Sequence, residues 1–190
     1  MTQVPATTTP VTPQDLVAAL GAAYTAQMGH PPEPDTLAVL CAQVALETGN
    51  MKSLICYNIG NIKRGPGPDW CSFKTFEYVG TPPVKTSMVC DFSAWPSLES
   101  ACESFVAFLY QHYPEAWTAA VHGDPEGFAR GLRVRGYYTA PVEQYAAGVR
   151  AWFGTYRKIV GGDSGATEPE LAAGDAAVLA TAGLLDGGAE

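Results

Sequence analysis

Apolar residues at helical spacing mark the first third of the chain. Thr12 followed by Pro13 is a strong helix start, because Thr caps the first turn and Pro fits its first position. A second apolar helix is predicted to begin with Asp35 as its cap and to stop at Gly49. The apolar residues that repeat every four positions in the first helix are Leu16, Leu20 and Tyr24.

Three more helices are predicted in the second half of the chain. Ser97 starts the first of them, Asp-Pro-Glu at residues 124–126 starts a short one, and Pro141 opens a long last helix. Aromatic residues at helical spacing indicate a packed core rather than contacts with a cofactor. The inward positions predicted for the last helix are Val142, Tyr145, Val149, Trp152, Phe153 and Tyr156.

The segment between the second and third predicted helices follows another pattern. Residues 50–70 are rich in Gly, Asn and Pro and predict a loop. Residues 73–79 and 85–92 contain strand-forming side chains and flank Gly-Thr-Pro-Pro at 80–83, which predicts a hairpin. The predicted fold class is therefore α+β, predominantly α, with a small β-hairpin lobe.

Composition divides the chain into three parts. Residues 1–11 are rich in Pro and Thr and predict an extended segment, residues 12–160 form the predicted domain, and residues 161–190 are a Gly/Ala-rich tail. The tail holds six acids and no base, whereas the rest of the chain has 13 acids against 11 bases. The predicted domain is nearly neutral, and no basic stripe indicates nucleic acid as a partner.

Several classes of protein are disfavoured by the sequence. No apolar run approaches the roughly 20 residues of a membrane span. Residues 1–10 have neither a basic start nor an apolar core, so we expect a protein made in the cytoplasm without a signal peptide. The five cysteines include no Cys-x-x-Cys pair and the three histidines are scattered, so neither a metal site nor a cofactor is expected. Cys41 and Cys102 fall on apolar helix faces and are expected to be buried thiols.

Glu47 stands on a helix face that should be buried. At about 100° per residue it falls near Leu40 and within reach of Leu37 and Val44. A buried carboxyl is costly to ionise, so its pKa rises, and a carboxyl that keeps its proton at neutral pH is what a general acid needs. The alternative is a helix-end Glu that turns out to water.

Glu77 is the candidate partner of Glu47, because it lies in the first strand of the predicted hairpin. Hydrolysis of a glycosidic bond needs one carboxylic acid to protonate the leaving oxygen. A second carboxylate then activates water or attacks the sugar. A helix-borne acid that faces a strand-borne acid across a cleft meets this need, although most pairs of Glu are surface charges.

A series of short motifs runs through the predicted domain. They read AQVALETG at 42–49, YNIGNIK at 57–63, TFEY at 75–78, FSAWPS at 92–97, YPEA at 113–116, DPEGFA at 124–129 and GYYTAP at 136–141, followed by Tyr145. Their order and spacing resemble the bacterial glucosaminidase family of peptidoglycan hydrolases, which includes flagellar rod-associated and autolysin enzymes. The resemblance covers roughly residues 13–158 and implies a lysozyme-like fold that acts on peptidoglycan glycan strands.

The resemblance also implies roles for individual residues. Glu47 would be the general acid, and Glu77 the base or water-activating carboxylate. Tyr137 matches the active-site tyrosine of the family, with a core aromatic as the alternative, and Tyr138 beside it is a further candidate for substrate binding.

Three residues of the loop and hairpin are candidates for sugar contacts. Asn58 and Asn61 are placed to hydrogen-bond N-acetyl or hydroxyl groups, or else they are loop residues that tolerate unusual backbone angles. Trp70 is either a stacking face for a sugar or a packing residue.

Two departures from the family pattern leave the cleaved bond open. Asn50-Met51 stand where the family usually has Trp-Gly, and Gly60-Asn61 replace the usual Phe-Gly of the loop. The primary expectation is an endo-β-N-acetylglucosaminidase. The alternatives are a muramidase, a lytic transglycosylase that needs a single Glu, and a non-catalytic wall-binding or phage structural module.

The expected biological setting follows from residues 1–10 and from the acidic tail. A wall hydrolase made without a signal peptide indicates a phage lysin, a virion-associated lysin or a toxin moved by a secretion system, acting on the cell wall or periplasm after delivery. Residues 161–190 are then a candidate docking segment for a delivery or virion partner.

Overall fold

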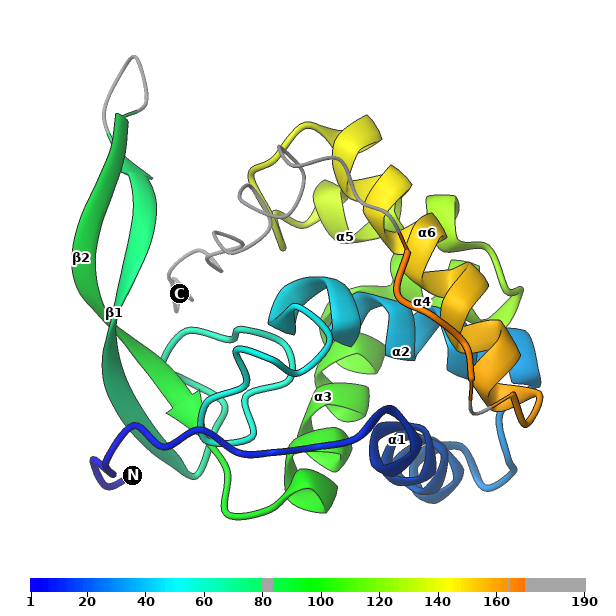
Figure 1. Ribbon diagram of the computed structural model, residues 1–190, viewed down its shortest axis with the longest axis horizontal. Coiled ribbons are helices and arrows are strands. Elements are labelled where there is room, and N and C mark those ends of the chain that lie inside the picture. The colour runs from blue at the N-terminus through cyan, green and yellow to red at the C-terminus, as the bar shows by residue number, and fades with distance from the viewer. Residues whose placement is uncertain (80–83, 164, 170–190) are drawn as a thin grey trace.

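The computed structural model describes residues 1–79, 84–163 and 165–169. It consists of six helices and a two-stranded sheet within those residues, and the hairpin stands to one side of the helical body (Figure 1). This arrangement confirms the predicted α+β class, predominantly α with a small hairpin lobe. The helices are α1 (Pro13–Met28), α2 (Pro34–Thr48), α3 (Leu98–His112), α4 (Pro114–Val121), α5 (Pro125–Val134) and α6 (Val142–Val160).

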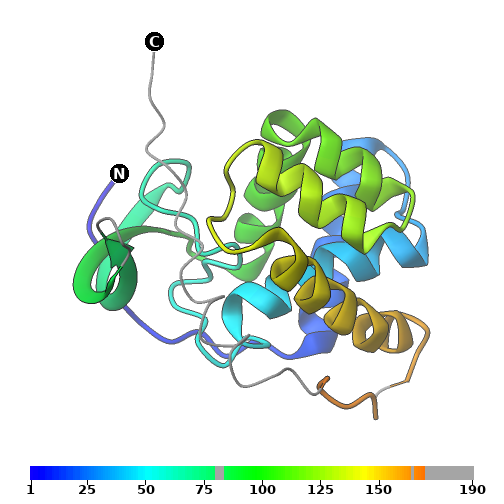
Figure 2. The same cartoon turned by 90° about the horizontal axis from the view of Figure 1, so that it is seen from above.

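Helix α2 is the centre of the helical body. Its buried positions run without a break from Thr36 to Thr48, because α1, α4 and α6 all pack against it. Figure 2 shows this central position from a second direction. A helix that is apolar around most of its circumference belongs in the middle of a core. Any polar side chain on this helix must therefore find its partners inside the protein.

The helix starts follow the predicted signals, with one exception. Thr12 caps α1 in a reciprocal capping box with Asp15, Ser97 caps α3 and Asp124 caps α5. The prediction that Asp35 caps α2 was wrong. Glu33 holds the cap position, since Pro34 takes the first helical position, and Asp35 in the first turn instead accepts a 2.8 Å contact from Arg157 Nε.

Strands β1 (Asp69–Val79) and β2 (Val84–Ala94) form the antiparallel hairpin, each extending beyond the predicted range. The predicted turn at residues 80–83 lies outside the described residues. Two backbone hydrogen bonds join the N-terminal segment to the base of the hairpin. The Trp70 amide donates to the Thr2 carbonyl (3.1 Å), and the Val4 amide donates to the Trp70 carbonyl (2.8 Å). The start of the chain thus adds a short parallel bridge to the lobe, with Gln3 opposite Trp70.

Helix α4 was not predicted, although Pro114 at its first position and Glu115 in its first turn are a helix-start signal; only Tyr113 separates it from α3. It packs closely against α5 at Gly131. A Cβ atom at that position would lie 2.4 Å from the Ala116 backbone nitrogen, so glycine is required for the two backbones to approach.

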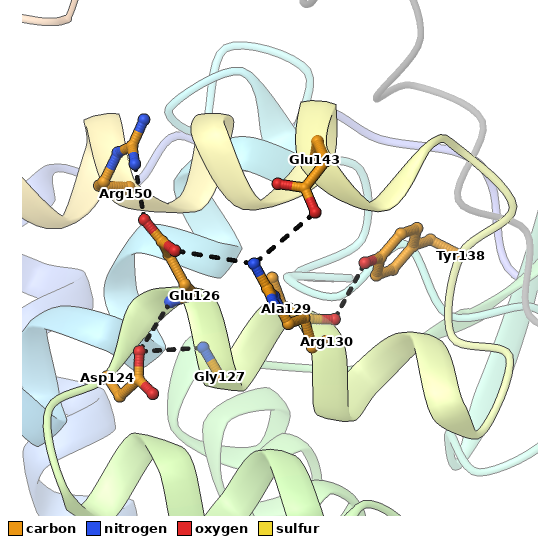
Figure 3. A network of polar contacts seen from close by, with 8 residues as sticks. All are labelled: Asp124, Glu126, Gly127, Ala129, Arg130, Tyr138, Glu143 and Arg150. Atoms are coloured by element: carbon orange, nitrogen blue, oxygen red, sulfur yellow. Dashed lines mark hydrogen bonds and ion pairs between the residues drawn. The ribbon is translucent and has the colours of Figure 1, made fainter.

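Polar contacts tie α5 to α6 along their exposed side (Figure 3). Glu126 accepts a 2.6 Å contact from Arg150, and Arg130 lies between Glu126 (3.9 Å) and Glu143 (3.6 Å). Exposed ion pairs contribute little to stability, typically up to about 1 kcal/mol each. These contacts join α5 to α6, the helix that carries Tyr145.

Of the five cysteines, Cys41 and Cys102 are fully buried thiols, as predicted. After α6, the described tail residues fold back on the body. Thr155 Oγ1 donates to the Thr167 carbonyl (3.0 Å), and Glu168 accepts from Lys52 (2.7 Å). Residues 170–190 of the tail lie outside the described residues. None of the described helices is long and apolar enough to cross a membrane.

Candidate active site

Glu47 lies in the last turn of α2, just before Gly49, which adopts the left-handed conformation (φ 57°) that ends the helix. Only 3% of Glu47 is exposed. Its Oε1 accepts a 2.7 Å hydrogen bond from the Tyr145 hydroxyl, while its Oε2 is buried without a hydrogen-bond partner. The alternative of a Glu that turns out to water is therefore wrong.

This environment favours the neutral carboxyl. Burial raises the pKa of Glu47 from its ordinary value of 4.5 to about 8, and hydrogen bonding from Tyr145 and Asn61 opposes the shift without cancelling it. At neutral pH the side chain therefore carries a proton that it can give away. That is the protonation state of a general acid.

Tyr145 is a site residue that the sequence analysis assigned only to the core. Its ring is buried and stacks on Tyr138, with centroids 3.7 Å apart and planes 6° apart. The Tyr138 hydroxyl in turn donates to the Ala129 carbonyl on α5, so the pair is fixed to the body (Figure 3). A buried phenol needs a hydrogen-bond partner. Both Tyr145 and Glu47 were predicted to point inward, so this rule could have suggested from sequence that the two form a hydrogen bond.

Tyr137 and Tyr138 are both fully buried. The Tyr137 hydroxyl donates to the Gly60 carbonyl (2.8 Å), which fixes the 58–62 loop against the body. In this structure both tyrosines position neighbouring groups, and neither ring presents a face to solvent. Their assignment to substrate binding stays a prediction.

The two loop asparagines have different surroundings. The side-chain amide of Asn58 already has hydrogen-bond partners within the protein. It donates to the Ile62 and Ser93 carbonyls (2.8 and 3.0 Å) and accepts from the Ile62 backbone amide (2.8 Å). Asn61 has a positive φ of 50° and donates to the Glu47 carbonyl (2.8 Å). The unusual backbone angle of the loop alternative is therefore found at Asn61, which also joins the loop directly to the turn that carries Glu47, while the amide of Asn58 holds the loop together from within.

The hairpin brings two further candidates. Trp70 is partly exposed at the start of β1, and the Arg64 guanidinium lies 3.9 Å from its ring centre. Glu77 pairs in register with Thr86 of β2, and its side chain lies outside the described part of the structure. Within the described residues, no group of three His, Cys, Asp or Glu is placed to hold a metal ion.

Gln43 is the second site residue that the sequence analysis missed. It lies one helical turn before Glu47, is fully buried, and neither polar atom of its amide has a hydrogen-bond partner. Its amide nonetheless lies close enough to Tyr137 and Tyr145 to lower the pKa of both phenols against the larger effect of their burial. A Gln four residues before a Glu on an apolar helix is visible in sequence, and its meaning depends on what packs against it.

Comparison with known proteins identifies structures that share the fold of this chain. No protein-family profile and no curated protein matches the chain. Among solved structures, a mutant of a peptidoglycan hydrolase from Sphingomonas sp. A1 is 29% identical, with a TM-score of 0.58 over 77% of this chain and 97% of its own. The glycoside hydrolase domain of Salmonella typhimurium FlgJ is 25% identical, with a TM-score of 0.52 over 81% and 94%.

The chain shares the fold of these hydrolases. The resemblance to glucosaminidase-type, lysozyme-like enzymes predicted from the motifs is thereby confirmed at the level of structure. The catalytic domain of the autolysin Auto from Listeria monocytogenes shows the same fold at 20% identity, with a TM-score of 0.53 over 79% of this chain and 87% of its own. The matches span nearly all of the first two proteins' own length, so they concern a whole domain.

Proposed function

We propose that this protein is a glycoside hydrolase that cleaves β-1,4 bonds of the bacterial cell-wall glycan, with Glu47 as the general acid. The observation that carries the proposal is the state of Glu47: a buried carboxyl with a pKa of about 8, held at one oxygen by Tyr145. The structural similarity of the chain to a peptidoglycan hydrolase and to a glycoside hydrolase domain supports the choice of substrate.

The proposed chemistry starts with the proton of Glu47. As the bond between the sugar carbon and the leaving oxygen lengthens, Glu47 protonates that oxygen and becomes a carboxylate. The Tyr145 hydroxyl donates to Oε1, so it stabilises the charge that develops on Glu47. We assign Glu77 as the second carboxylate, which activates the attacking water or attacks the sugar.

Substrate access is part of the proposal. Because only 3% of Glu47 is exposed, a glycosidic oxygen reaches it only after a neighbouring segment moves. The 58–62 loop is our candidate for that segment, since Asn61 binds the Glu47 carbonyl and Gly60 accepts from Tyr137. Asn61 and Trp70 are the candidates in this region for contacts with sugar once the loop has moved.

Mass spectrometry of the sugar ends released from purified peptidoglycan tests this proposal. New reducing ends at N-acetylglucosamine support an endo-β-N-acetylglucosaminidase. Reducing ends at muramic acid would reassign the bond, and anhydro-sugars would identify a lytic transglycosylase. Glu47→Gln should abolish product release, with Glu103→Gln, an exposed position on α3, as the matched control. Undiminished release by Glu47→Gln, or no release by the wild type, would overturn the proposal.

For the setting, we propose a lytic enzyme that reaches the wall by phage release or through a secretion system, with residues 161–190 as the docking segment. The six acids and absence of bases in that segment support a basic partner surface. Deleting residues 170–190 should leave peptidoglycan cleavage intact and abolish delivery. Loss of cleavage by the purified deletion variant would contradict this assignment.

A further inference from the structure

The inside of the site contains more hydrogen-bonding groups than the proposed reaction uses. Gln43 and Glu47 lie one turn apart on α2 and face Tyr145 from α6 and Tyr137 from the segment before α6. All four residues are between 0 and 3% exposed. Buried polar groups that stay unpaired are costly, at about 1–3 kcal/mol each, so a cluster of this kind requires a physical account.

The donors and acceptors of this cluster can be counted. Each phenol has a single O–H, and both are spent: Tyr137 donates to the Gly60 carbonyl and Tyr145 donates to Glu47 Oε1. The phenol oxygens keep lone pairs that can accept, and so do Glu47 Oε2 and Gln43 Oε1. The two N–H groups of Gln43 Nε2 are the donors of this cluster that no contact uses.

Protonation of Glu47 adds the donor that the unpaired acceptors of the cluster lack. Oε1 already accepts from Tyr145, so the proton belongs on Oε2, which then becomes a donor. Gln43 Oε1, one turn away on the same helix, is a buried acceptor without a partner, and the Gln43 amide lies close enough to Tyr137 and Tyr145 to lower the pKa of both phenols. With Glu47 ionised, both Glu47 Oε2 and Gln43 Oε1 are buried acceptors that no hydrogen in the cluster satisfies.

We propose that Gln43 is a positioning residue for Glu47: its amide oxygen accepts from the protonated Glu47 carboxyl, and its amide nitrogen holds the phenols of Tyr137 and Tyr145. An amide suits this position because it supplies a donor and an acceptor and never carries charge. The arrangement holds the proton on the oxygen that Tyr145 does not occupy. The hydrogen bonds proposed for Gln43 do not depend on the proposed function, and only their importance for catalysis rests on it.

The groups around the cluster do not change charge in the pH range in which Glu47 titrates. Burial raises the pKa of Glu47 against the lowering effect of the hydrogen bonds from Tyr145 and Asn61, and no charged side chain of the described residues is among the causes of the shift. Tyr113 acts on Tyr137 from the junction of α3 and α4, and burial raises the pKa of Tyr113 to about 12. All three tyrosines therefore stay neutral through the range in which Glu47 titrates.

The test is a ¹³C NMR titration of the Glu47 carboxyl in the full-length chain, assigned by the resonance that Glu47→Gln removes. Gln43→Met keeps the length of the side chain and removes the acceptor of the protonated form. We expect the Glu47 midpoint to fall by about one pH unit, a tenfold weaker hold on the proton. Tyr145→Phe removes a bond to the charged form and should move the midpoint up.

Thr36→Val is the matched control, because Thr36 is a buried polar residue at the opposite end of α2 that donates to the Val121 carbonyl. It should leave the midpoint unchanged. If Gln43→Met does not fold, Gln43→Glu decides, since a second carboxyl at this position shares the proton and should raise the midpoint. An unshifted midpoint in the folded Met variant, or in the Glu variant if the Met variant is unfolded, would overturn the proposal. The titration needs no activity, so it stands even if Glu47→Gln still cleaves peptidoglycan.

Discussion

Around Glu47, every residue of α2 from Thr36 to Thr48 is buried, whereas β2 exposes 62% of Val84 and 67% of Val89. The helical body holds its candidate acid between three helices and a loop. The hairpin is a two-stranded sheet, which is marginal by itself in water, and it depends on the N-terminal segment and the Asn58 loop at its base. One carboxyl is thus held in a fixed environment, and its proposed partner is carried on a lobe with few supports.

Removing the partner carboxyl gives the sharpest comparison of the two regions. Glu77→Gln should lower the rate of peptidoglycan cleavage by about 10²- to 10⁴-fold, because the second carboxylate is lost while the acid stays in place. Product release followed by mass spectrometry checks this, with Thr86→Ala on the facing strand as the control. Near-normal cleavage with anhydro-sugar products would instead assign the chemistry to Glu47 alone.

The burial of Glu47 should also appear in stability. Its pKa is raised in the folded state, so the stability given by the protonated form is fully present below about pH 4.5 and is lost as pH rises through about 8. Glu47→Gln removes that dependence, and we expect it to be roughly 3–5 kcal/mol more stable than wild type at pH 9 and about equal at pH 4. Urea unfolding at both pH values measures the difference. An equal gap between the two proteins at pH 4 and pH 9 would show that ionisation of the buried carboxyl is not its cause.

The support at the base of the hairpin can be tested through Asn58. Asn58→Ala removes three hydrogen bonds to Ile62 and Ser93, both of which are buried, so we expect a loss of about 2–3 kcal/mol in unfolding free energy. Thr86→Ala, exposed on β2, should cost less than about 0.5 kcal/mol. Equal costs for the two variants would mean that the loop does not couple the lobe to the body.

The smallest effect is expected where the tail meets the body. The ion pair between Lys52 and Glu168 is exposed, with side-chain exposures of 68% and 45%, so Lys52→Ala should change stability by no more than about 0.5 kcal/mol. Cleavage rates should not change. A loss of activity on this substitution would show that the tail contact helps to hold the end of α2.

Helix starts and the hairpin could be predicted because they depend on local chemistry. The Thr12, Ser97 and Asp124 caps each act on their own first turn, and the hairpin follows from strand-forming residues on either side of a turn signal. Asp35 and α4 show the limit of this approach. Pro34 takes the first helical position, so Glu33 and not Asp35 is the cap residue of α2. Helix α4 starts with Pro114, but a single residue separates it from α3, so the spacing of apolar residues alone does not divide the two helices.

By itself, the sequence determined that Glu47 falls on an apolar helix face, because helical periodicity and hydrophobicity are properties of a single segment. Only the tertiary structure decided which groups meet that carboxyl. Tyr145 is 98 residues away and Asn61 is 14, and neither distance along the chain says that a hydroxyl or an amide will lie against it. The raised pKa of Glu47 and the unpaired amide of Gln43 come from that packing, since desolvation depends on what surrounds a group in space.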